Sequence, residues 1–221
     1  MKNYNLKIST AFLWVAIYFG FMFFYTFLDV TIWRKISPDF SSWLNIITIA
    51  LCVCGFIILL KKTGYELQIL SNTTITGILL AIGCFVLFFL LLDNCLDPIF
   101  ESIFPASEQA YQESIQTLIK SPITSLLQVC IIAPVIEEIL MRGFILDGLK
   151  DTYGVRVALI VSAILFALLH FNMVQTLSAF VCGLILGLLY LKTKSILCCI
   201  IAHCGYNVIS YITMIYPYID K

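Results

Sequence analysis

Seven long apolar segments dominate the sequence and decide which folds are open to it. They lie at about 10–28, 43–60, 74–92, 123–146, 157–171, 174–191 and 196–215. A transmembrane helix needs about 20 mostly apolar residues, whereas the strands of a membrane barrel alternate apolar and polar side chains. Because the segments are long and unbroken, the sequence predicts an all-α, polytopic membrane bundle of about seven transmembrane helices.

The composition agrees with a membrane protein. Charged residues make up 12% of the chain, about half the share found in a soluble domain. Lysine plus arginine equal aspartate plus glutamate at 13 each, so no excess of positive charge favours a nucleic acid. We therefore expect the lipid bilayer, and no nucleic acid, among the partners.

The lysines and arginines outside the apolar segments predict the orientation. The segment 93–121 is expected to be the longest loop, is acidic, and leaves open whether residues 106–120 form a surface helix. Placing it outside puts eight cations inside, namely Lys2, Lys7, Lys61, Lys62, Lys150, Arg156, Lys192 and Lys194. Four then lie outside, namely Arg34, Lys35, Lys120 and Lys221. Cytoplasmic loops carry the excess of such residues, so we predict a cytoplasmic N-terminus and an outer C-terminus.

The position of ionisable residues divides the chain into two parts. The first three apolar segments carry aromatic side chains and almost no ionisable groups, while the last four contain every charge within a span. We therefore expect residues 1–120 to supply N-terminal transmembrane helices and an outer loop, for packing or substrate handling. Residues 121–221 are expected to form the core that holds the site.

The fifth and sixth segments predict a cavity. Between Arg156 and Lys192 lie 35 residues without a charge. With about four residues for a turn, each helix has about 15–16 residues and a length of ~23 Å, against a hydrocarbon core of ~30 Å. The tip, HFNMVQ at 170–175, would then lie at membrane depth, where irregular backbone is tolerated only beside protein or a wet cavity. We therefore infer a cavity beside His170.

Six polar residues within the last four segments are the candidates for chemistry. Ionisable groups inside a membrane are costly and usually face a cavity or a partner. The set comprises Glu137, Glu138, Arg142, His170, His203 and Asn207. We expect these side chains to share one functional site.

Helical spacing assigns different roles to the two glutamates. Glu138 and Arg142 are four residues apart, so they share a face and can form an ion pair. Glu137 points about 100° away from Glu138 and has no partner in its own helix, which suits a general acid or base. Pro134, three residues earlier, is expected to kink the helix and open space beside them.

The two histidines suggest what the site does. His203 and Asn207 are four residues apart in HCGYN, and His170 follows Phe166 at the same spacing in FALLH. Glutamate with histidine can activate a water, and histidine with asparagine can donate hydrogen bonds to an oxyanion. Two histidines and a glutamate can also hold zinc with an open position. The residues alone leave hydrolysis with and without zinc open.

The three motifs resemble those of one known family. EEILMR matches the E-E-x-x-x-R motif of the CAAX prenyl protease and bacteriocin-processing (CPBP) family, also called the Abi family. FALLH matches its F-x-x-x-H motif and HCGYN its H-x-x-x-N motif, in family order. The resemblance covers about residues 121–215. It implies a polytopic intramembrane endopeptidase.

The resemblance also implies a role for each residue. Glu137 and His170 would activate the attacking water, and His203 and Asn207 would stabilise the oxyanion. Glu138 and Arg142 would support the site. The family has been described both as metalloproteases and as glutamate-dependent proteases, so zinc held by Glu137, His170 and His203 stays an alternative.

The resemblance leaves the substrate open. Family members cleave prenylated C-terminal C-a-a-X peptides, or take part in bacteriocin maturation, self-immunity or peptide signalling. This short chain resembles the bacterial type, which implies a bacterial cell membrane and a peptide or membrane-protein substrate. Two other functions remain as alternatives: a non-catalytic immunity or binding protein, and a proton-coupled transporter. The transporter usually shows internal repeats, and we find none.

Overall fold

The chain folds into helices joined by short connections. The computed structural model describes residues 5–219, without the side chains of residues 108, 218 and 219. It is 86% helix, and the described residues contain no strand, which confirms the all-α class. The α-helices and π-helical segments (η) are α1 (Ile8–Leu28), η1 (Asp29–Trp33), α2 (Arg34–Ile36), α3 (Ser41–Lys62), α4 (Ile75–Phe88), η2 (Phe89–Leu96), α5 (Asp97–Ile103), α6 (Pro105–Ile119), α7 (Pro122–Leu126), η3 (Leu127–Ile132), α8 (Ala133–Glu138), η4 (Ile139–Leu146), α9 (Asp147–Tyr153), α10 (Val155–Ala167), α11 (Met173–Thr193) and α12 (Ile196–Ile219).

Five helices are long and apolar enough to cross a membrane, counting only the described residues. They are Ile8–Ile36, Ser41–Lys62, Ile75–Ile103, Met173–Thr193 and Ile196–Pro217. The expected number of seven is therefore not confirmed. The fourth expected segment is a continuous helical run from α7 to α9 that carries the two adjacent glutamates, and the fifth, α10, has only 13 residues. The chain is an integral, multi-pass membrane protein.

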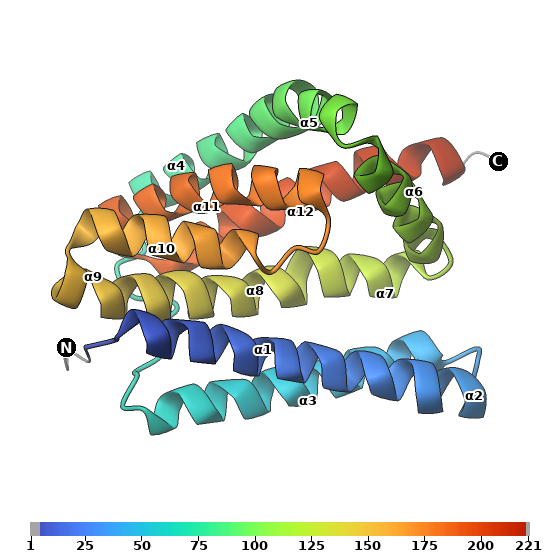
Figure 1. Ribbon diagram of the computed structural model, residues 1–221, viewed down its shortest axis with the longest axis horizontal. Coiled ribbons are helices and arrows are strands. Elements are labelled where there is room, and N and C mark those ends of the chain that lie inside the picture. Colours follow the sequence, from blue (N-terminus) through green and yellow to red (C-terminus); the bar gives the residue numbers. More distant parts are fainter. Residues whose placement is uncertain (1–4, 220–221) are drawn as a thin grey trace.

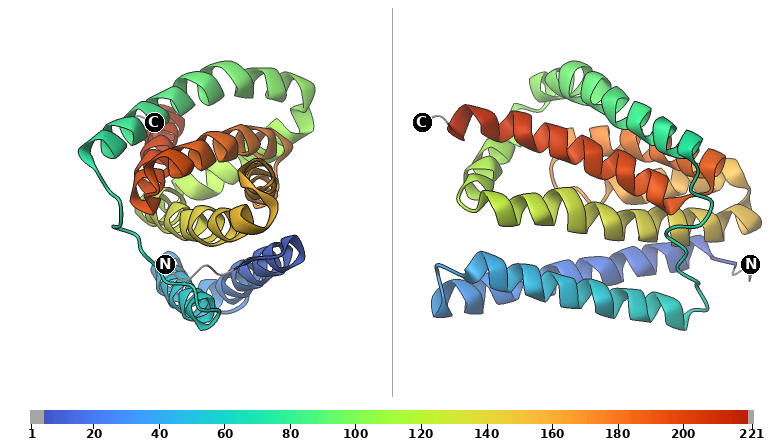
Figure 2. Two further views of the ribbon diagram at one scale, coloured as in Figure 1. Left: turned by 90° about the vertical axis from the view of Figure 1, so that its left-hand side faces the viewer. Right: turned by 180° about the vertical axis from the view of Figure 1, so that it is seen from behind.

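The helices are arranged around the run from α7 to α9. α1 and α3 pair as a hairpin along one side of this run (Figure 1), and the remaining helices lie on its other side (Figure 2). α12 packs against α4, α8 and α11, while α10 packs mainly against α11. The glutamate-bearing helix therefore lies between the N-terminal hairpin and the C-terminal helices.

Several segments that carry the predicted inner lysines and arginines gather at one end of the bundle. The start of α1, the α9–α10 turn and the α11–α12 turn lie there (Figure 1). The Leu6 amide donates to the Gly148 carbonyl at 2.9 Å, and the Asn72 side chain donates to the Lys194 carbonyl at 3.2 Å. The grouping is the one that the predicted topology needs, and which end faces the cytoplasm stays a prediction.

The segment 93–121 is not the loop that we expected. It continues α4 through η2 into α5 and then forms α6, so residues 105–119 do form a largely exposed helix. The acidic side chains misled the prediction because two of them face inward. Asp93 accepts a hydrogen bond from the Tyr206 hydroxyl at 2.7 Å, and Asp97 accepts one from the Ser178 hydroxyl. Such bonds offset the cost of burying a polar group.

The prediction that both helices of the α10–α11 hairpin are too short to cross the hydrocarbon core is confirmed for α10 only. α10 is about 20 Å long and falls short of the ~30 Å hydrocarbon core. α11 has 21 residues and reaches about 32 Å, so the prediction of two short helices was wrong for α11. The Asn172 side chain accepts a hydrogen bond from the Gln175 amide at 3.2 Å, which caps the start of α11.

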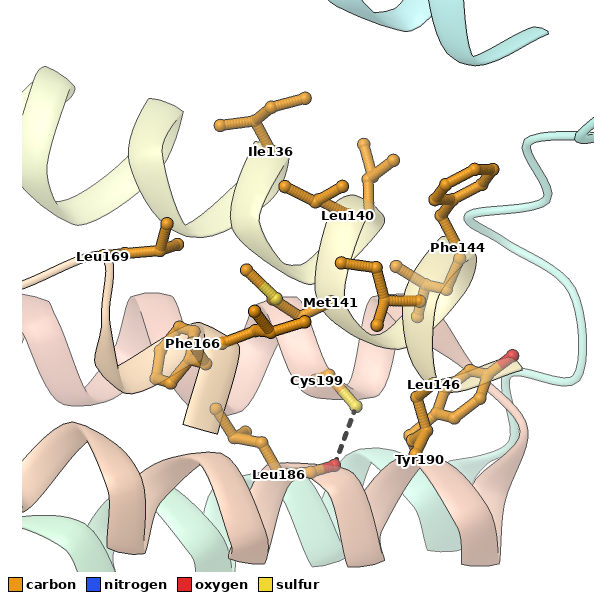
Figure 3. Close-up of a cluster of buried hydrophobic side chains, with 14 of the residues drawn as sticks. Ile136, Leu140, Met141, Phe144, Leu146, Phe166, Leu169, Leu186, Tyr190 and Cys199 are labelled. Carbon is orange, nitrogen blue, oxygen red and sulfur yellow. Dashed lines mark hydrogen bonds between the residues drawn. The ribbon is translucent and has the colours of Figure 1, made fainter. Parts of the chain in front are cut away.

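The core beneath the site consists of large apolar side chains from η4, α10, α11 and α12 (Figure 3). Leu140, Met141 and Phe144 are fully buried. The Cys199 thiol donates to the Leu186 carbonyl at 3.5 Å, so it is satisfied within the core. Because protein interiors are close-packed, this cluster holds the helix with the two glutamates in one position.

Gly183 lets α10 and α11 approach closely. A Cβ added there would lie 3.1 Å from the Ala163 Cα and 3.2 Å from the Phe166 Cδ1. We expect Gly183→Ala to lower the free energy of unfolding by about 1–3 kcal/mol, because the facing backbone cannot turn away. Gly83→Ala is the matched control, since nothing lies within 4 Å of its added Cβ; we expect a gain of about 0.5–1 kcal/mol. Thermal unfolding in detergent measures both, and equal shifts would contradict the prediction.

Candidate active site

Glu137 and Glu138 end a short stretch of regular helix between two irregular ones. α8 has six residues and lies between the π-helical segments η3 and η4. π-helical segments are rare and occur frequently at functional sites. All eight residues of η4 are buried, so the packed core fixes the irregular backbone. The two carboxyl groups therefore project from a helix whose register is disturbed on both sides.

Pro134 connects this irregularity to Asn207. In a π-helical pattern a backbone N–H bonds to the carbonyl five residues earlier, and proline has no N–H. The carbonyl five residues before Pro134 belongs to Val129, and it accepts a hydrogen bond of 2.9 Å from Asn207 Nδ2. Pro134 thus leaves a backbone acceptor to which Asn207 bonds, and the kink expected at Pro134 stays a prediction.

Glu138 is the centre of a fully buried ionic network. Its Oε1 accepts hydrogen bonds from Arg142 Nη1 at 2.8 Å and from His203 Nδ1 at 2.9 Å. Arg142 Nη2 donates to the Gly183 carbonyl at 3.2 Å. Glu138 and Arg142 are 0% and 1% exposed. The ion pair predicted from their spacing is present, and it extends to α11 and α12.

Phe166 lies among the charged residues. Its ring stands 4.4 Å from the Arg142 guanidinium carbon, a distance at which the cation is attracted to the ring face. The rings of His170 and His203 each lie 5.5 Å from it in edge-on orientation. The aromatic residue of the FALLH motif therefore contacts Arg142 and both histidines and helps to fix the three groups relative to one another.

Glu137 faces His203 across a short gap. Glu137 Oε2 lies 4.0 Å from His203 Nε2. A single water can contact both atoms, since hydrogen bonds of about 2.8 Å reach each of them. Because Nδ1 of His203 is held by Glu138, the imidazole presents its other nitrogen toward Glu137. The two glutamates thus lie at different nitrogens of His203, and of the two only Glu138 also pairs with Arg142.

His170 lies on the connection between α10 and α11. Its Nδ1 is 3.3 Å from the Phe166 carbonyl oxygen. A carbonyl only accepts hydrogen bonds, so Nδ1 carries the proton and Nε2 keeps its lone pair. The Thr176 hydroxyl donates to the His170 carbonyl at 3.0 Å, which holds the connection against α11. His170 can therefore accept a proton at Nε2.

A cavity of about 400 Å³ joins these residues, a size typical of ligand sites. Glu137, His170, His203 and Asn207 all line it. The cavity inferred beside His170 from the α10–α11 hairpin is therefore present. Glu138 and Arg142 do not line the cavity. Glu138 contacts His203 and Arg142 contacts Phe166, and both of these residues do line it.

The N-terminal hairpin contributes groups that we did not predict. Tyr18 and Tyr25 of α1 line the cavity, and the Tyr18 hydroxyl interacts with the Glu137 carboxyl group. Tyr18 is only 6% exposed and packs edge-on against Phe56 of α3 at 5.7 Å. The seven-residue spacing of the two tyrosines places both on one face of α1, a signal that could have found them.

The zinc alternative does not fit the described geometry. Within residues 5–219, no group of three His, Cys, Asp or Glu side chains has an arrangement that could hold a metal ion. Glu137, His170 and His203 therefore share a cavity without forming a ligand set.

A comparison with known families agrees with the motifs. Residues 119–209 match the family model described as "Rce1-like: Type II CAAX prenyl endopeptidase Rce1-like". Comparisons with curated proteins and with solved structures gave no match. The matched range runs from the end of α6 into α12 and contains all six candidate residues. Through residues 119–209 the chain is therefore similar to Rce1-like type II CAAX prenyl endopeptidases, and this match agrees with the resemblance of its motifs to the CPBP family.

Proposed function

We propose that the protein is an intramembrane endopeptidase that uses an activated water to hydrolyse a peptide bond of a membrane-associated peptide or protein. One observation carries this proposal. His203 is bonded to Glu138 through Nδ1 and faces Glu137 through Nε2 at 4.0 Å, at the wall of a cavity. A held imidazole opposite a carboxylate is an arrangement that moves protons to and from a bound reactant.

We assign activation of the water to Glu137 and His170. The carboxylate of Glu137 and the Nε2 lone pair of His170 can each accept a proton from water as its oxygen attacks the peptide carbonyl carbon. The carbon–nitrogen bond then breaks, and the same proton passes to the leaving amine. Proton transfer by a positioned side chain typically contributes 10²–10⁴ to the rate, about 3–5 kcal/mol of the barrier.

We assign stabilisation of the oxyanion to His203 and Asn207. Glu138, Glu137 and Arg142 together carry one net negative charge, and protonation of His203 brings the four side chains to neutrality. A protonated His203 donates from Nε2, and Asn207 Nδ2 has a second hydrogen beyond the one given to Val129. Each such donor contributes about 10²–10³ to kcat. Glu138 and Arg142 support these groups without touching substrate.

The biological setting is a further part of the proposal. We propose a role in bacteriocin maturation, self-immunity or peptide signalling at a bacterial cell membrane, with the N-terminus of the protease in the cytoplasm. The test is comparative peptidomics of cells that carry the wild type or Glu137→Gln. We expect a peptide end that is present only with the wild type, and identical peptide sets would sink the proposal.

The same experiment distinguishes the transporter alternative. Buried glutamate and histidine also form proton relays, and a relay would lose its phenotype in the same variants. A relay, however, produces no cleaved peptide. Purified wild-type protein in liposomes that releases a new peptide terminus therefore supports the protease and excludes a relay as the sole function.

Tyr18 provides a test of the part played by α1. The Tyr18→Phe substitution removes the hydroxyl beside Glu137 and keeps the ring against Phe56. A hydrogen bond to a charged group contributes about 1.5–3 kcal/mol, so we expect kcat/KM to fall roughly tenfold or more.

The matched control for Tyr18 is Tyr190→Phe. The Tyr190 hydroxyl also faces a carboxylate, Asp147, at 3.1 Å, but Tyr190 does not line the cavity. We expect this control to lower the unfolding temperature and leave kcat/KM unchanged. Equal effects of both substitutions on kcat/KM would show that Tyr18 acts only through folding.

A further inference from the structure

The connection between α10 and α11 carries His170 and is held from the side by the surface helix α6. We propose that Ser107 of α6 and Asn172 of the connection are positioning residues for His170, and that His170 is in place only while α6 lies against this connection. This inference rests on the proposed endopeptidase function and adds to it the support that α6 gives to the base.

His170 lies outside regular helix. α10 ends at Ala167 and α11 begins at Met173, so residues 168–172 belong to neither helix. The His170 amide donates to the Ala167 carbonyl at 3.1 Å, and the Thr176 hydroxyl donates to the His170 carbonyl at 3.0 Å. Short connections move more easily than the helices that they join. The position of the imidazole therefore depends on what holds this connection.

Two hydrogen bonds join the connection to the first turn of α6. Asn172 Nδ2 donates to the Ser107 carbonyl at 2.6 Å, and the Met173 amide donates to the Ser107 hydroxyl at 2.8 Å. Asn172 Oδ1 accepts a hydrogen bond from the Gln175 amide at 3.2 Å, so one side chain both caps α11 and contacts α6. Ser107 thus holds the chain two and three residues after His170.

α6 is joined to its neighbours by residues that are not helical. Phe104 before it and Ser121 near its end have φ and ψ of −121° and 62° and of −141° and 66°. A proline follows each of them, and proline disfavours the helical conformation in the residue before it. α6 is largely exposed, and the Ser125 hydroxyl donates to the Leu118 carbonyl at 3.1 Å near its C-terminal end. The bonds of Ser107 hold its other end.

α6 also forms part of the cavity wall. It crosses the end of the bundle beside the start of α11 (Figure 1). Tyr111 and Leu118 line the cavity, and the Tyr111 hydroxyl donates to the Met214 sulfur of α12 at 3.5 Å. A peptide in the cavity would therefore contact the helix that holds the connection with His170. Displacement of α6 would break the bonds of Ser107, and its return would restore the base.

The first test uses the fact that the chain has two histidines. Ring ¹⁵N labelling gives separate NMR signals for His170 and His203 in full-length protein in liposomes, and His170→Gln assigns them. We expect the wild-type His170 signal to show one form with the proton on Nδ1, since this nitrogen lies 3.3 Å from the Phe166 carbonyl oxygen. Ser107→Ala and Asn172→Ser should each broaden or split this signal and leave that of His203 unchanged. The serine side chain in Asn172→Ser can still cap α11 but lacks the amide donor.

The second test measures cleavage by the same variants. The probe is a synthetic peptide that spans the cleavage end identified by peptidomics. We expect kcat to fall roughly 3- to 10-fold in each variant, the usual effect of losing one neutral hydrogen bond, with a smaller change in KM because the base acts in the transition state. Added to His170→Gln, Ser107→Ala should cause no further loss, because Ser107 acts through His170.

Two further variants serve as controls. Ser107→Thr keeps the hydroxyl and should retain both the His170 signal and kcat. Ser114→Ala is the matched control on the same helix, because the Ser114 hydroxyl is exposed and donates within α6, to the Ala110 carbonyl at 3.0 Å. It should change neither the His170 signal nor kcat.

The outcomes separate this inference from the proposed function. An unchanged His170 signal in both variants overturns the inference, and so does an equal change in the His203 signal or a further loss of kcat in the His170→Gln background. A change confined to His170 upholds the support by α6. If the wild type then releases no peptide end, the proposed hydrolysis fails alone, and if the variants keep full kcat, the assignment of His170 as a base fails alone.

Discussion

Replacing Glu137 with glutamine is expected to lower kcat by roughly 10²–10⁴ and to leave the unfolding temperature unchanged. The amide has the shape of the carboxyl group and fits the same wall of the cavity, but it cannot take a proton from water. Glu137 Oε2 lies 4.0 Å from His203 Nε2, too far for a direct hydrogen bond, so its loss leaves the Glu138 network intact. The measurement is the cleavage rate of purified protein in liposomes, alongside thermal unfolding.

Two controls separate the chemistry of Glu137 from its charge. Glu137→Asp keeps a carboxylate at a changed position and should retain part of the activity. Glu113→Gln makes the same chemical change on the exposed face of α6 and should have no effect. Full activity of the glutamine variant would show that Glu137 is not the base and that the assignment of roles is wrong.

The spacing of the motif residues predicted the local part of the site. The four-residue separation of Glu138 and Arg142 gave the ion pair, because side chains at this spacing meet on one helix face whatever surrounds them. The different direction of Glu137 kept it out of the ion pair with Arg142 for the same reason. The 35-residue uncharged stretch predicted the cavity beside His170, although it predicted α11 to be too short.

The contacts between helices could not be predicted from the sequence. Nothing in EEILMR or HCGYN shows that His203 Nδ1 binds the oxygen of Glu138 that also holds Arg142. That contact depends on how α12 packs against α8. The helical path of residues 93–121 was missed for a related reason, because Asp97 finds its partner on α11. Acidity suggests a loop only while such partners are unknown.

Replacing Glu138 with methionine is expected to lower the free energy of unfolding by about 3–5 kcal/mol, because it leaves the Arg142 guanidinium buried without a counter-charge. Arg142 is 1% exposed, and its remaining hydrogen bond goes to the Gly183 carbonyl. Chemical denaturation or thermal unfolding in detergent measures the loss. A change below about 1 kcal/mol, the usual range for exposed pairs, would contradict the burial of this ion pair.

The double substitution Glu138→Met with Arg142→Met then separates folding from activity. Replacing both partners of a buried ion pair with apolar side chains of similar size is often neutral or stabilising, so most of the lost stability should return. Activity should not return with it, because His203 Nδ1 loses the acceptor that fixes its ring and supports its positive charge; kcat should stay lower by roughly 10²–10³. A double variant that regains both stability and activity would show that Glu138 serves only to neutralise Arg142. One that regains stability alone assigns Glu138 to the orientation of His203, and the charge balance of the site would then follow from the demands of the imidazole and not from those of the fold.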